Sequence, residues 1–412
     1  MGRLVVATAV ALIAGLTVPP SLGPTVGRAV ASPVGVCATA KATVSRTPPP
    51  PPPTPSHDPE WQAIGGRALA TDGMALPKGA TPAPKGLTAR SWLVADLDSG
   101  AVLGGCGPHA YGAPASVQKL LLVATVLGTL DPDQVVRVTR GDLQFEPGSS
   151  AVGLVPNGRY SVETLWLGLL LVSGNDAANV LARLGGGQDG VAGTMRAMNA
   201  KAEHLGAYQT HAATPSGLDG PGQLTSAYDL ALIARACFAR EDFSRYAATE
   251  RAKIPAQPKR KGQRKYSGYQ IQNDNQLLFN YRGAIGGKTG FTDLARHTYV
   301  GAAERDGRRL VVTVLGAERQ PLPGWEQGAK LLDWGFRQPR DPSVGRLVEP
   351  GETSRVATSP TPRGGGKRQA GAGTDSGGIP WWLVLVALVS VILVVCAGLV
   401  MVSRRRRVRR GG

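Results

Sequence analysis

The sequence holds few of the residues that bind metal ions or build disulfide frameworks. Its 412 residues include only 5 histidines and 4 cysteines, and aromatic residues make up 5% of the chain. The histidines show neither H-x-x-x-H nor H-E-x-x-H spacing, which would place two zinc ligands on one helix face; they are His57, His109, His204, His211 and His297. We therefore expect no metal and no cofactor, and a metalloenzyme is disfavoured.

Acidic residues are also scarce relative to basic ones. There are 29 Asp and Glu against 46 Lys and Arg, so the formal net charge is +17. The apolar fraction of 42% is large enough for a hydrophobic core. This excludes a wholly disordered or a collagen-like chain.

The first residues have the pattern of a secretory signal peptide. Arg3 precedes the apolar run LVVATAVALIAGLTV, and the small residues Ala29-Val30-Ala31 supply a cleavage site. An N-terminal membrane anchor is the weaker alternative, because the run is short and Pro19 and Pro20 end it. We predict a signal peptide over residues 1–31.

The C-terminal region has the pattern of a membrane span. Trp381 to Val402 contains no charge, and arginines follow it at positions 404–407, 409 and 410. Such a run spans roughly 30 Å as a helix, the thickness of the bilayer hydrocarbon, and flanking arginines stay in the cytoplasm. We predict one transmembrane helix over 379–403 and a basic cytoplasmic tail over 404–412. The expected location is therefore the cell membrane, with a single pass and the preceding domain outside.

An exported domain changes the interpretation of the basic charge and of the cysteines. Outside the cell the counter-charges are anionic wall polymers or lipid head groups, and we expect no nucleic acid. Cys396 lies in the predicted span, and Cys237 lies on an apolar stretch that favours a buried thiol. Cys37 and Cys106 are free to pair in an oxidising exterior, although sequence alone leaves their geometry open.

Composition divides the rest of the chain into a domain between two connecting segments. Residues 32–88 contain Pro48 to Pro53 and are predicted to be a Pro-rich extracytoplasmic spacer. Residues 338–378 are rich in Pro, Gly, Ser, Thr and Arg, which is linker composition. The remaining residues, 89–337, have the size of one large domain.

The order of patterns within 89–337 predicts an α+β fold. WLVAD and AVLGG flank a turn from Leu97 to Gly100, which predicts a β-hairpin. Helical patterns follow in SVQKLLLVATVLG, SVETLWLGLLLV, DAANVLARL and TSAYDLALIARACF. The strands GAIGGKTG, TYVGAAE and RRLVVTVLGAE then precede an amphipathic helix through WEQGAKLLDWGF. We predict one antiparallel sheet built from both ends of the domain, with a helical lobe packed on it.

Three short strings contain residue types that are suited to catalysis by a serine nucleophile. They are Ser116-Val117-Gln118-Lys119, Ser173-Gly174-Asn175 and Lys288-Thr289-Gly290. A serine in the first turn of a helix has unpaired N–H groups nearby for a developing oxyanion, and a lysine three residues on lies on the same face. A serine hydroxyl needs a neighbouring base, and a lysine can serve if burial and a second cation lower its pKa.

The candidate roles follow from these residue types. Ser116 would be the nucleophile, Lys119 its base and Lys288 the second cation. Ser173 would relay a proton to the leaving amine, and Asn175 would hold the substrate backbone. On the Gly-rich strand Thr289 would bind a substrate carboxylate and Gly290 would allow close approach, while the N–H groups of Phe291 and Ser116 would form an oxyanion hole.

Each string alone has an ordinary structural explanation. Ser116 and Ser173 could cap helices, Lys119 could be a solvated helix lysine, and Gly286-Gly287 could form a bulge. The conjunction of the three strings in this order, on an exported domain, favours the catalytic interpretation.

The chain resembles the serine D-alanyl-D-alanine carboxypeptidases, the low-molecular-mass penicillin-binding proteins, especially their actinobacterial members. The strings that carry the resemblance are APASVQKLL, LVSGNDAANVLA, SGLDGPGQLTSAYDLALIARA, NDNQLLFNYRGAIGGKTGFTD and LLDWGF. The resemblance implies a β-lactamase/DD-peptidase-like fold and removal of the terminal D-alanine from peptidoglycan stem pentapeptides through an acyl-enzyme on Ser116. It also implies covalent inhibition by β-lactam antibiotics.

The sequence departs from that family after the third string. Leu294-Ala295-Arg296-His297 stand where the family usually has Ala-Gly and an aromatic residue, and Arg319 is not clearly the arginine with which some members bind the substrate carboxylate.

Two alternative functions remain open at this point. One is a β-lactamase-like hydrolase. It is disfavoured because the Glu-x-x-Leu-Asn string, which class A β-lactamases share and need for fast deacylation, is absent between Asn175 and Lys288. The other is a catalytically silent wall-binding protein.

The basic loop with Lys259-Arg260-Lys261, Arg264 and Lys265 is interpreted as solvated, with contact to anionic wall polymer as the alternative.

Overall fold

A computed structural model describes residues 37–44, 47–259 and 265–352 of the chain. The predicted signal peptide, transmembrane helix and basic tail, and most of the predicted linker, lie outside these residues. Within them, no helix is both long and apolar enough to cross a membrane.

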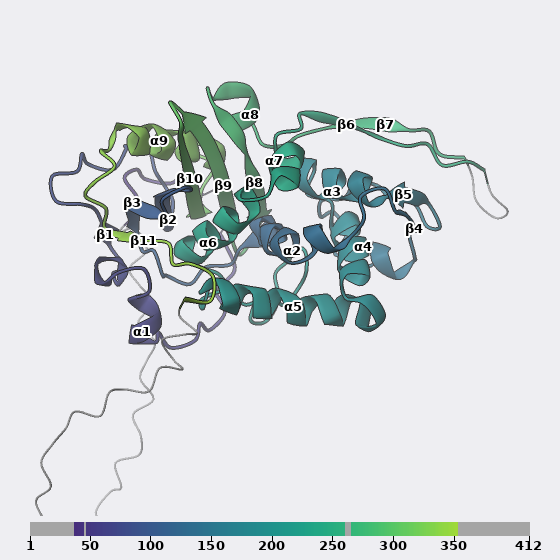
Figure 1. Ribbon diagram of the computed structural model, residues 1–412, viewed down its shortest axis with the longest axis horizontal. Coiled ribbons are helices and arrows are strands. Elements are labelled where there is room, and N and C mark those ends of the chain that lie inside the picture. The colour runs from purple at the N-terminus through teal and green to yellow at the C-terminus, as the bar shows by residue number, and fades with distance from the viewer. Residues whose placement is uncertain (1–36, 45–46, 260–264, 353–412) are drawn as a thin grey trace, which may run out of the picture. The chain divides into compact units, whose positions relative to one another are not determined.

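The fold is an antiparallel sheet with a helical lobe on one side, as the sequence predicts (Figure 1). The sheet order is β1-β3-β2-β10-β9-β8, and β11 pairs with β3. Its strands are β1 (Met74–Ala75), β2 (Ser91–Asp96), β3 (Ala101–Cys106), β8 (Ala284–Thr292), β9 (Arg296–Arg305), β10 (Arg308–Ala317) and β11 (Gly345–Arg346). Two small two-stranded sheets are formed by β4 (Val135–Arg137) with β5 (Arg159–Ser161), and by β6 (Arg251–Ile254) with β7 (Tyr269–Gln272).

The helices fall between the two groups of strands, except for short ones at the start and α9 at the end. They are α1 (Pro59–Gln62), α2 (Lys119–Val126), α3 (Val162–Leu171), α4 (Asn175–Gly185), α5 (Gly190–Leu205), α6 (Ala227–Phe238), α7 (Glu241–Ala247), α8 (Leu277–Asn280) and α9 (Gly324–Arg337). Short 3-10 helices are η1 (Arg67–Leu69), η2 (Ala115–Gln118), η3 (Leu127–Thr129), η4 (Gly141–Leu143) and η5 (Gly187–Asp189). The sequence did not predict α5.

The central strands are apolar on both faces because both faces are covered. Along β2, Leu93 and Ala95 belong to the core shared with the helical lobe, whereas Trp92 and Val94 belong to the core under α9. This alternation follows the period of two residues of a strand. The sheet is therefore the middle layer, with α9 on one face and α6 with the lobe on the other.

The folded unit extends beyond both predicted domain boundaries. Before residue 89, Leu69, Ala75 and Leu87 are fully or almost fully buried, and β1 pairs with β3. After residue 337, β11 pairs with β3, and Leu347 is buried. Parts of the segments predicted to be spacer and linker thus belong to the fold, because backbone pairing recruits short segments that lack apolar periodicity of their own.

The N-terminal segment is also joined covalently to the sheet. Cys37 and Cys106 form a disulfide across 69 positions of sequence, with their Cα atoms 5.6 Å apart. This is the pairing that the sequence left open. Cys237 is a free, buried cysteine, as its apolar surroundings predicted.

Candidate active site

Ser116 lies where the helical lobe meets the edge of the sheet. Its helical turn, η2, leads into α2 and packs against β8, the strand at the sheet edge. The sequence predicted a serine in a first helical turn, and the structure refines this to a 3-10 turn followed by an α-helix. Ala115, which precedes the serine, has a φ of +49°, a left-handed conformation that non-glycine residues seldom adopt. Such conformations cluster at functional sites.

The amine of Lys119 has three oxygen neighbours. Its Nζ lies 2.8 Å from Ser116 Oγ, 2.8 Å from Asn175 Oδ1 and 2.9 Å from the carbonyl oxygen of Ser216. An amide oxygen and a carbonyl oxygen can only accept, so they take the two N–H groups of a neutral amine. The remaining lone pair then faces the Ser116 hydroxyl, which is the arrangement needed to remove its proton.

Burial favours the neutral form of this amine. Lys119 has no exposed surface. Desolvation, with the nearby Lys288 ammonium as a second cause, holds the pKa of Lys119 well below its ordinary value, and Asp176 opposes the shift. This agrees with the expectation that burial and a second cation adapt the lysine to act as a base.

The carboxylate of Asp176, near Lys119, is engaged by the backbone of the loop 152–154. It accepts hydrogen bonds from the backbone N–H groups of Val152, Gly153 and Leu154, each 2.9 Å long. These bonds spread the negative charge over the loop. This role could not be predicted from the sequence, because a carboxylate that binds backbone groups has no partner side chain to recognise.

The second string lies at the start of α4. Asn175 is its first residue and is buried, with its carbonyl on Lys119 and its Nδ2 donating to Ser149 Oγ at 3.0 Å. Ser173 has a φ of +60°, and within the described part of the chain its buried Oγ has no hydrogen-bond partner. That hydroxyl is therefore available to a bound molecule.

The third string lies within the edge strand β8. Lys288 is 1% exposed, and desolvation lowers its pKa to about 8 although Asp274 opposes the change. Thr289 is half-buried, and Phe291 is exposed beside His297, with 4.7 Å between ring centroids. An edge strand presents unpaired backbone groups, which an extended peptide can pair with.

Gly290 is required for the strand to approach the serine. A Cβ at this position would lie 2.8 Å from the backbone nitrogen of Ser116 and 2.4 Å from Thr298 Oγ1. Glycine thus brings the backbone of β8 next to the N–H group that the sequence assigned to an oxyanion hole. Thr298 completes this contact by donating to the carbonyl oxygen of Pro114 at 2.7 Å.

The residues that depart from the family pattern are accommodated within the sheet. Arg296 is 3% exposed and makes a two-point ion pair with Glu318, with bonds of 2.8 and 2.9 Å. Its charge is therefore matched by the carboxylate of Glu318. Arg319 is exposed, and no ion pair involving it occurs within the described residues.

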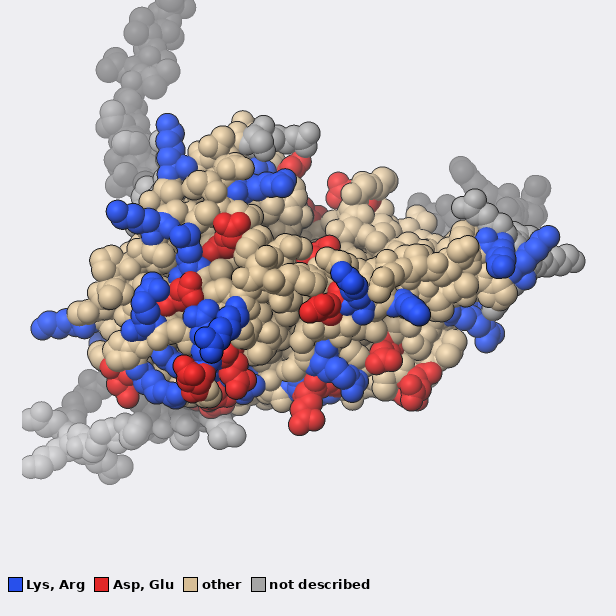
Figure 2. Space-filling view, turned by 90° about the horizontal axis from the view of Figure 1, so that it is seen from above, with Lys and Arg blue, Asp and Glu red and all other residues tan. Residues whose placement is uncertain are grey.

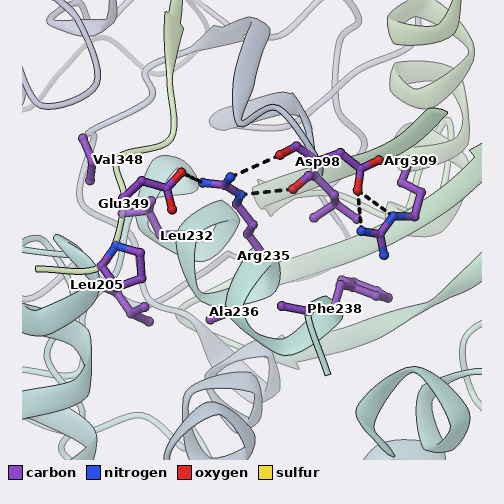
Figure 3. A pocket seen from close by; sticks show the side chains of 12 residues that line it. Asp98, Leu205, Leu232, Arg235, Ala236, Phe238, Arg309, Val348 and Glu349 are labelled. Carbon is purple, nitrogen blue, oxygen red and sulfur yellow. Dashed lines mark hydrogen bonds and ion pairs between the residues drawn. The ribbon is translucent and has the colours of Figure 1, made fainter. Parts of the chain in front are cut away.

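Another hollow of the surface lies apart from the three strings. A cavity of about 270 Å³ is lined by residues of α6, the β2–β3 turn and the C-terminal segment, and it contains none of the predicted site residues. Figure 3 shows Arg235 in it, directed at Glu349 and at the backbone near Asp98. Its charged groups are paired with one another, and the ion pair between Arg235 and Glu349 attaches the C-terminal segment to α6.

Comparisons with known proteins agree with the geometry. The family model for D-alanyl-D-alanine carboxypeptidases (Peptidase S11) matches residues 78–319. The D-alanyl-D-alanine carboxypeptidase DacB2 of Mycobacterium tuberculosis is 46% identical over 276 residues, covering 66% of this chain and 90% of that protein. DacD of Salmonella typhimurium is 34% identical and is matched over 67% of its length and 65% of this chain.

Solved structures give the same result. A crystal structure of D-alanyl-D-alanine carboxypeptidase from Mycobacterium tuberculosis H37Rv is 45% identical, with a TM-score of 0.59, covering 66% of this chain and 99% of that one. The Streptomyces K15 DD-transpeptidase is 25% identical, with a TM-score of 0.58, covering 63% of this chain and 100% of that one.

Substitution of Gly290 tests the approach of β8 to the serine. In Gly290→Ala the added methyl group would stand against the Ser116 N–H, and we expect acylation of Ser116 by a fluorescent penicillin to slow by about 10²-fold or more. Gly220→Ala is the matched control, since a Cβ there meets no atom within 4 Å. Thermal unfolding of both variants separates loss of reaction from loss of fold, and a wild-type acylation rate in a folded Gly290→Ala protein would contradict this role.

Ser149 is predicted to hold the Asn175 amide in place. Removing its hydroxyl in Ser149→Ala loses one hydrogen bond worth about 1 kcal/mol, so we expect an acylation rate about fivefold lower. The neighbouring Ser150→Ala variant is the control, because the Ser150 contact to Asn175 uses only its backbone oxygen. Equal rates for the two variants would show that the Ser149 contact has no part in the reaction.

Proposed function

Because this chain belongs to the D-alanyl-D-alanine carboxypeptidase family, we propose that it removes the terminal D-alanine from peptidoglycan stem peptides. The observation that carries the proposal is the position of Lys119 Nζ, 2.8 Å from Ser116 Oγ, with Asn175 Oδ1 and the carbonyl oxygen of Ser216 as its two other neighbours. The same serine is proposed to be acylated by β-lactam antibiotics.

The first half-reaction forms an ester on Ser116. The hydroxyl proton passes to Lys119 Nζ as Oγ attacks the carbonyl carbon of the penultimate D-alanine. The backbone N–H groups of Ser116 and Phe291 stabilise the oxyanion, and Gly290 allows the two segments to lie close together. The C–N bond then breaks, and the leaving amine takes a proton through Ser173, whose buried hydroxyl has no other hydrogen bond within the described residues.

The second half-reaction hydrolyses that ester. Water attacks the acyl carbon and gives up a proton to Lys119. The bond between the acyl carbon and Ser116 Oγ then breaks, and Lys119 returns the proton to Oγ, which restores the starting state and releases the carboxylate product. Substrate binding is assigned to the third string. Thr289 binds the terminal carboxylate, Lys288 adds positive potential, and the peptide pairs with the edge of β8.

Acylation of the serine tests the proposal directly. The purified chain is expected to release D-alanine from a stem-peptide mimic and to gain the mass of one penicillin on Ser116, measured by mass spectrometry of the digested protein. Ser116→Ala is expected to lose both signals while keeping its thermal unfolding temperature. Absence of both reactions in the wild-type protein would end the enzymatic assignment, and rapid penicillin turnover would favour a β-lactamase.

The domain is also proposed to lie outside the cell, anchored through residues 379–403. Its support is the uncharged sequence run followed by arginines, together with the Cys37–Cys106 disulfide, which oxidising compartments favour. The same fluorescent penicillin in a membrane-impermeant form is then expected to label Ser116 in intact cells. Labelling that requires lysis would contradict this location.

The pH dependence of acylation is expected to follow two lysines with opposite requirements. Lys119 acts in its neutral form, so the rate falls as pH drops through its lowered pKa. Lys288 acts as a cation, and its pKa of about 8 means that positive charge is lost above that pH.

The rate for a carboxylate substrate should therefore fall by roughly tenfold per pH unit above pH 8. In Lys288→Arg the guanidinium stays protonated, so a correctly folded variant should lack this alkaline decline. A wild-type rate that stays constant from about pH 8 to 10 would contradict the assigned role of Lys288.

A further inference from the structure

The hairpin of β6 and β7 carries a concentration of unpaired positive charge. Residues 251–272 contain no aspartate or glutamate, and their basic members are Arg251, Lys253, Lys259, Arg260, Lys261, Arg264 and Lys265. Those within the described residues are all exposed. Lys253, Lys259 and Lys265 form no ion pair there. Figure 2 shows Lys and Arg side chains gathered at the end of the molecule to which the hairpin projects.

The neighbouring hairpin of β4 and β5 adds to this charge. Arg137 and Arg159 lie directly opposite each other in its antiparallel register. Like charges in that position destabilise a strand pair. Both arginines are exposed, and within the described residues neither side chain has an acidic partner. Two facing arginines with nothing to neutralise them indicate a surface that meets a negative partner.

The two hairpins are held together as one structure. The side chain of Gln257 accepts from the backbone N–H of Arg159 at 2.8 Å and donates to the carbonyl oxygen of the same residue at 2.9 Å. Gln257 is 6% exposed, so this connection is buried. The backbone segments that carry the exposed cations are therefore held side by side by a buried contact. We call Arg137, Arg159, Lys253 and Lys259 the basic face.

The hairpin that carries part of the basic face contacts the loop that positions Asn175. Tyr269 of β7 donates its hydroxyl to the carbonyl oxygen of Val152, which belongs to the loop held by Asp176. That loop also carries Ser149, which binds Asn175. The hairpin is therefore joined by direct contacts to the lobe that holds the catalytic residues.

We propose that the basic face binds an anionic polymer of the cell wall, one whose repeating units carry phosphate groups. Regularly spaced phosphates complement exposed cations that have no partners of their own. A lipid bilayer is the less suitable occupant, because residues 255–268 contain no Leu, Ile, Val, Phe, Trp or Met that could insert beneath the head groups. Val135 of β4 and Tyr269 of β7 are exposed, but two separate apolar side chains do not form an insertion surface. The polymer would keep the enzyme beside its substrate. The proposal uses the extracytoplasmic location proposed above, but its test does not depend on catalysis.

Binding of fluorescent poly(glycerol phosphate) to the purified full-length chain tests the proposal. We expect binding measured by fluorescence anisotropy to weaken steeply between about 50 and 200 mM salt, because the contacts are exposed ion pairs. The variant Arg137→Gln, Arg159→Gln, Lys253→Gln, Lys259→Gln should bind about tenfold more weakly or worse. Its rate of penicillin acylation should match the wild type.

A second variant with the same change in net charge provides the control. It carries Arg67→Gln, Lys78→Gln, Lys85→Gln and Arg282→Gln, four exposed cations that also form no ion pair among the described residues. We expect it to keep wild-type affinity for the polymer. Equal loss in both variants would show an effect of net charge alone, and binding to anionic phospholipid vesicles without binding to the polymer would assign the face to a membrane. Either outcome overturns the proposal.

Discussion

The chemistry of this protein depends on keeping one lysine amine neutral inside the fold. An ammonium in water is strongly solvated, and removing that solvation is costly. Here the surroundings of Lys119 offer two acceptors and one hydroxyl, which match the two N–H groups and the lone pair of an amine. The site therefore leaves the neutral form with no unsatisfied group, while burial, with Lys288 as a second cause, disfavours the charged form. A more exposed lysine at the same spacing would remain protonated and could not accept the serine proton.

The active site depends on glycines that let other backbone segments lie close to the segment of Ala115 and Ser116. Gly217 has a φ of +83°, and a Cβ there would lie 1.9 Å from the carbonyl oxygen of Ala115. Gly290 brings β8 to the other side of the same segment. The serine is thus held between two glycine-containing segments, one from a loop and one from the sheet edge. This leaves the unusual backbone of Ala115 little freedom to relax.

The sequence predicted what depends on local pattern. The hairpin of β2 and β3, the helices α2, α3, α4 and α6 and the three final strands all follow from their periodicity and turns. The side chains of Ser116 and Lys119 meet across one helical turn as their spacing predicted, whereas the contact of Asn175 with Lys119 was not predicted. Ser216 was missed because it contributes a backbone oxygen, for which no residue type is diagnostic. The boundaries were set too narrowly because β1 and β11 gain their order from β3, which is distant in sequence. Helix α5 was missed because glycine and alanine give it only a weak apolar stripe.

The sheet topology requires almost the whole domain to be synthesised before the active site can form. Strand β2, near the start of the domain, pairs directly with β10, near its end, and β8 joins the sheet only through β9. The nucleophile is therefore synthesised well before the strands that complete its surroundings. Contacts so distant in sequence form slowly. A chain that ended between residues 292 and 308 would carry every reactive side chain of the site, yet lack β10, the central strand on which their arrangement is built.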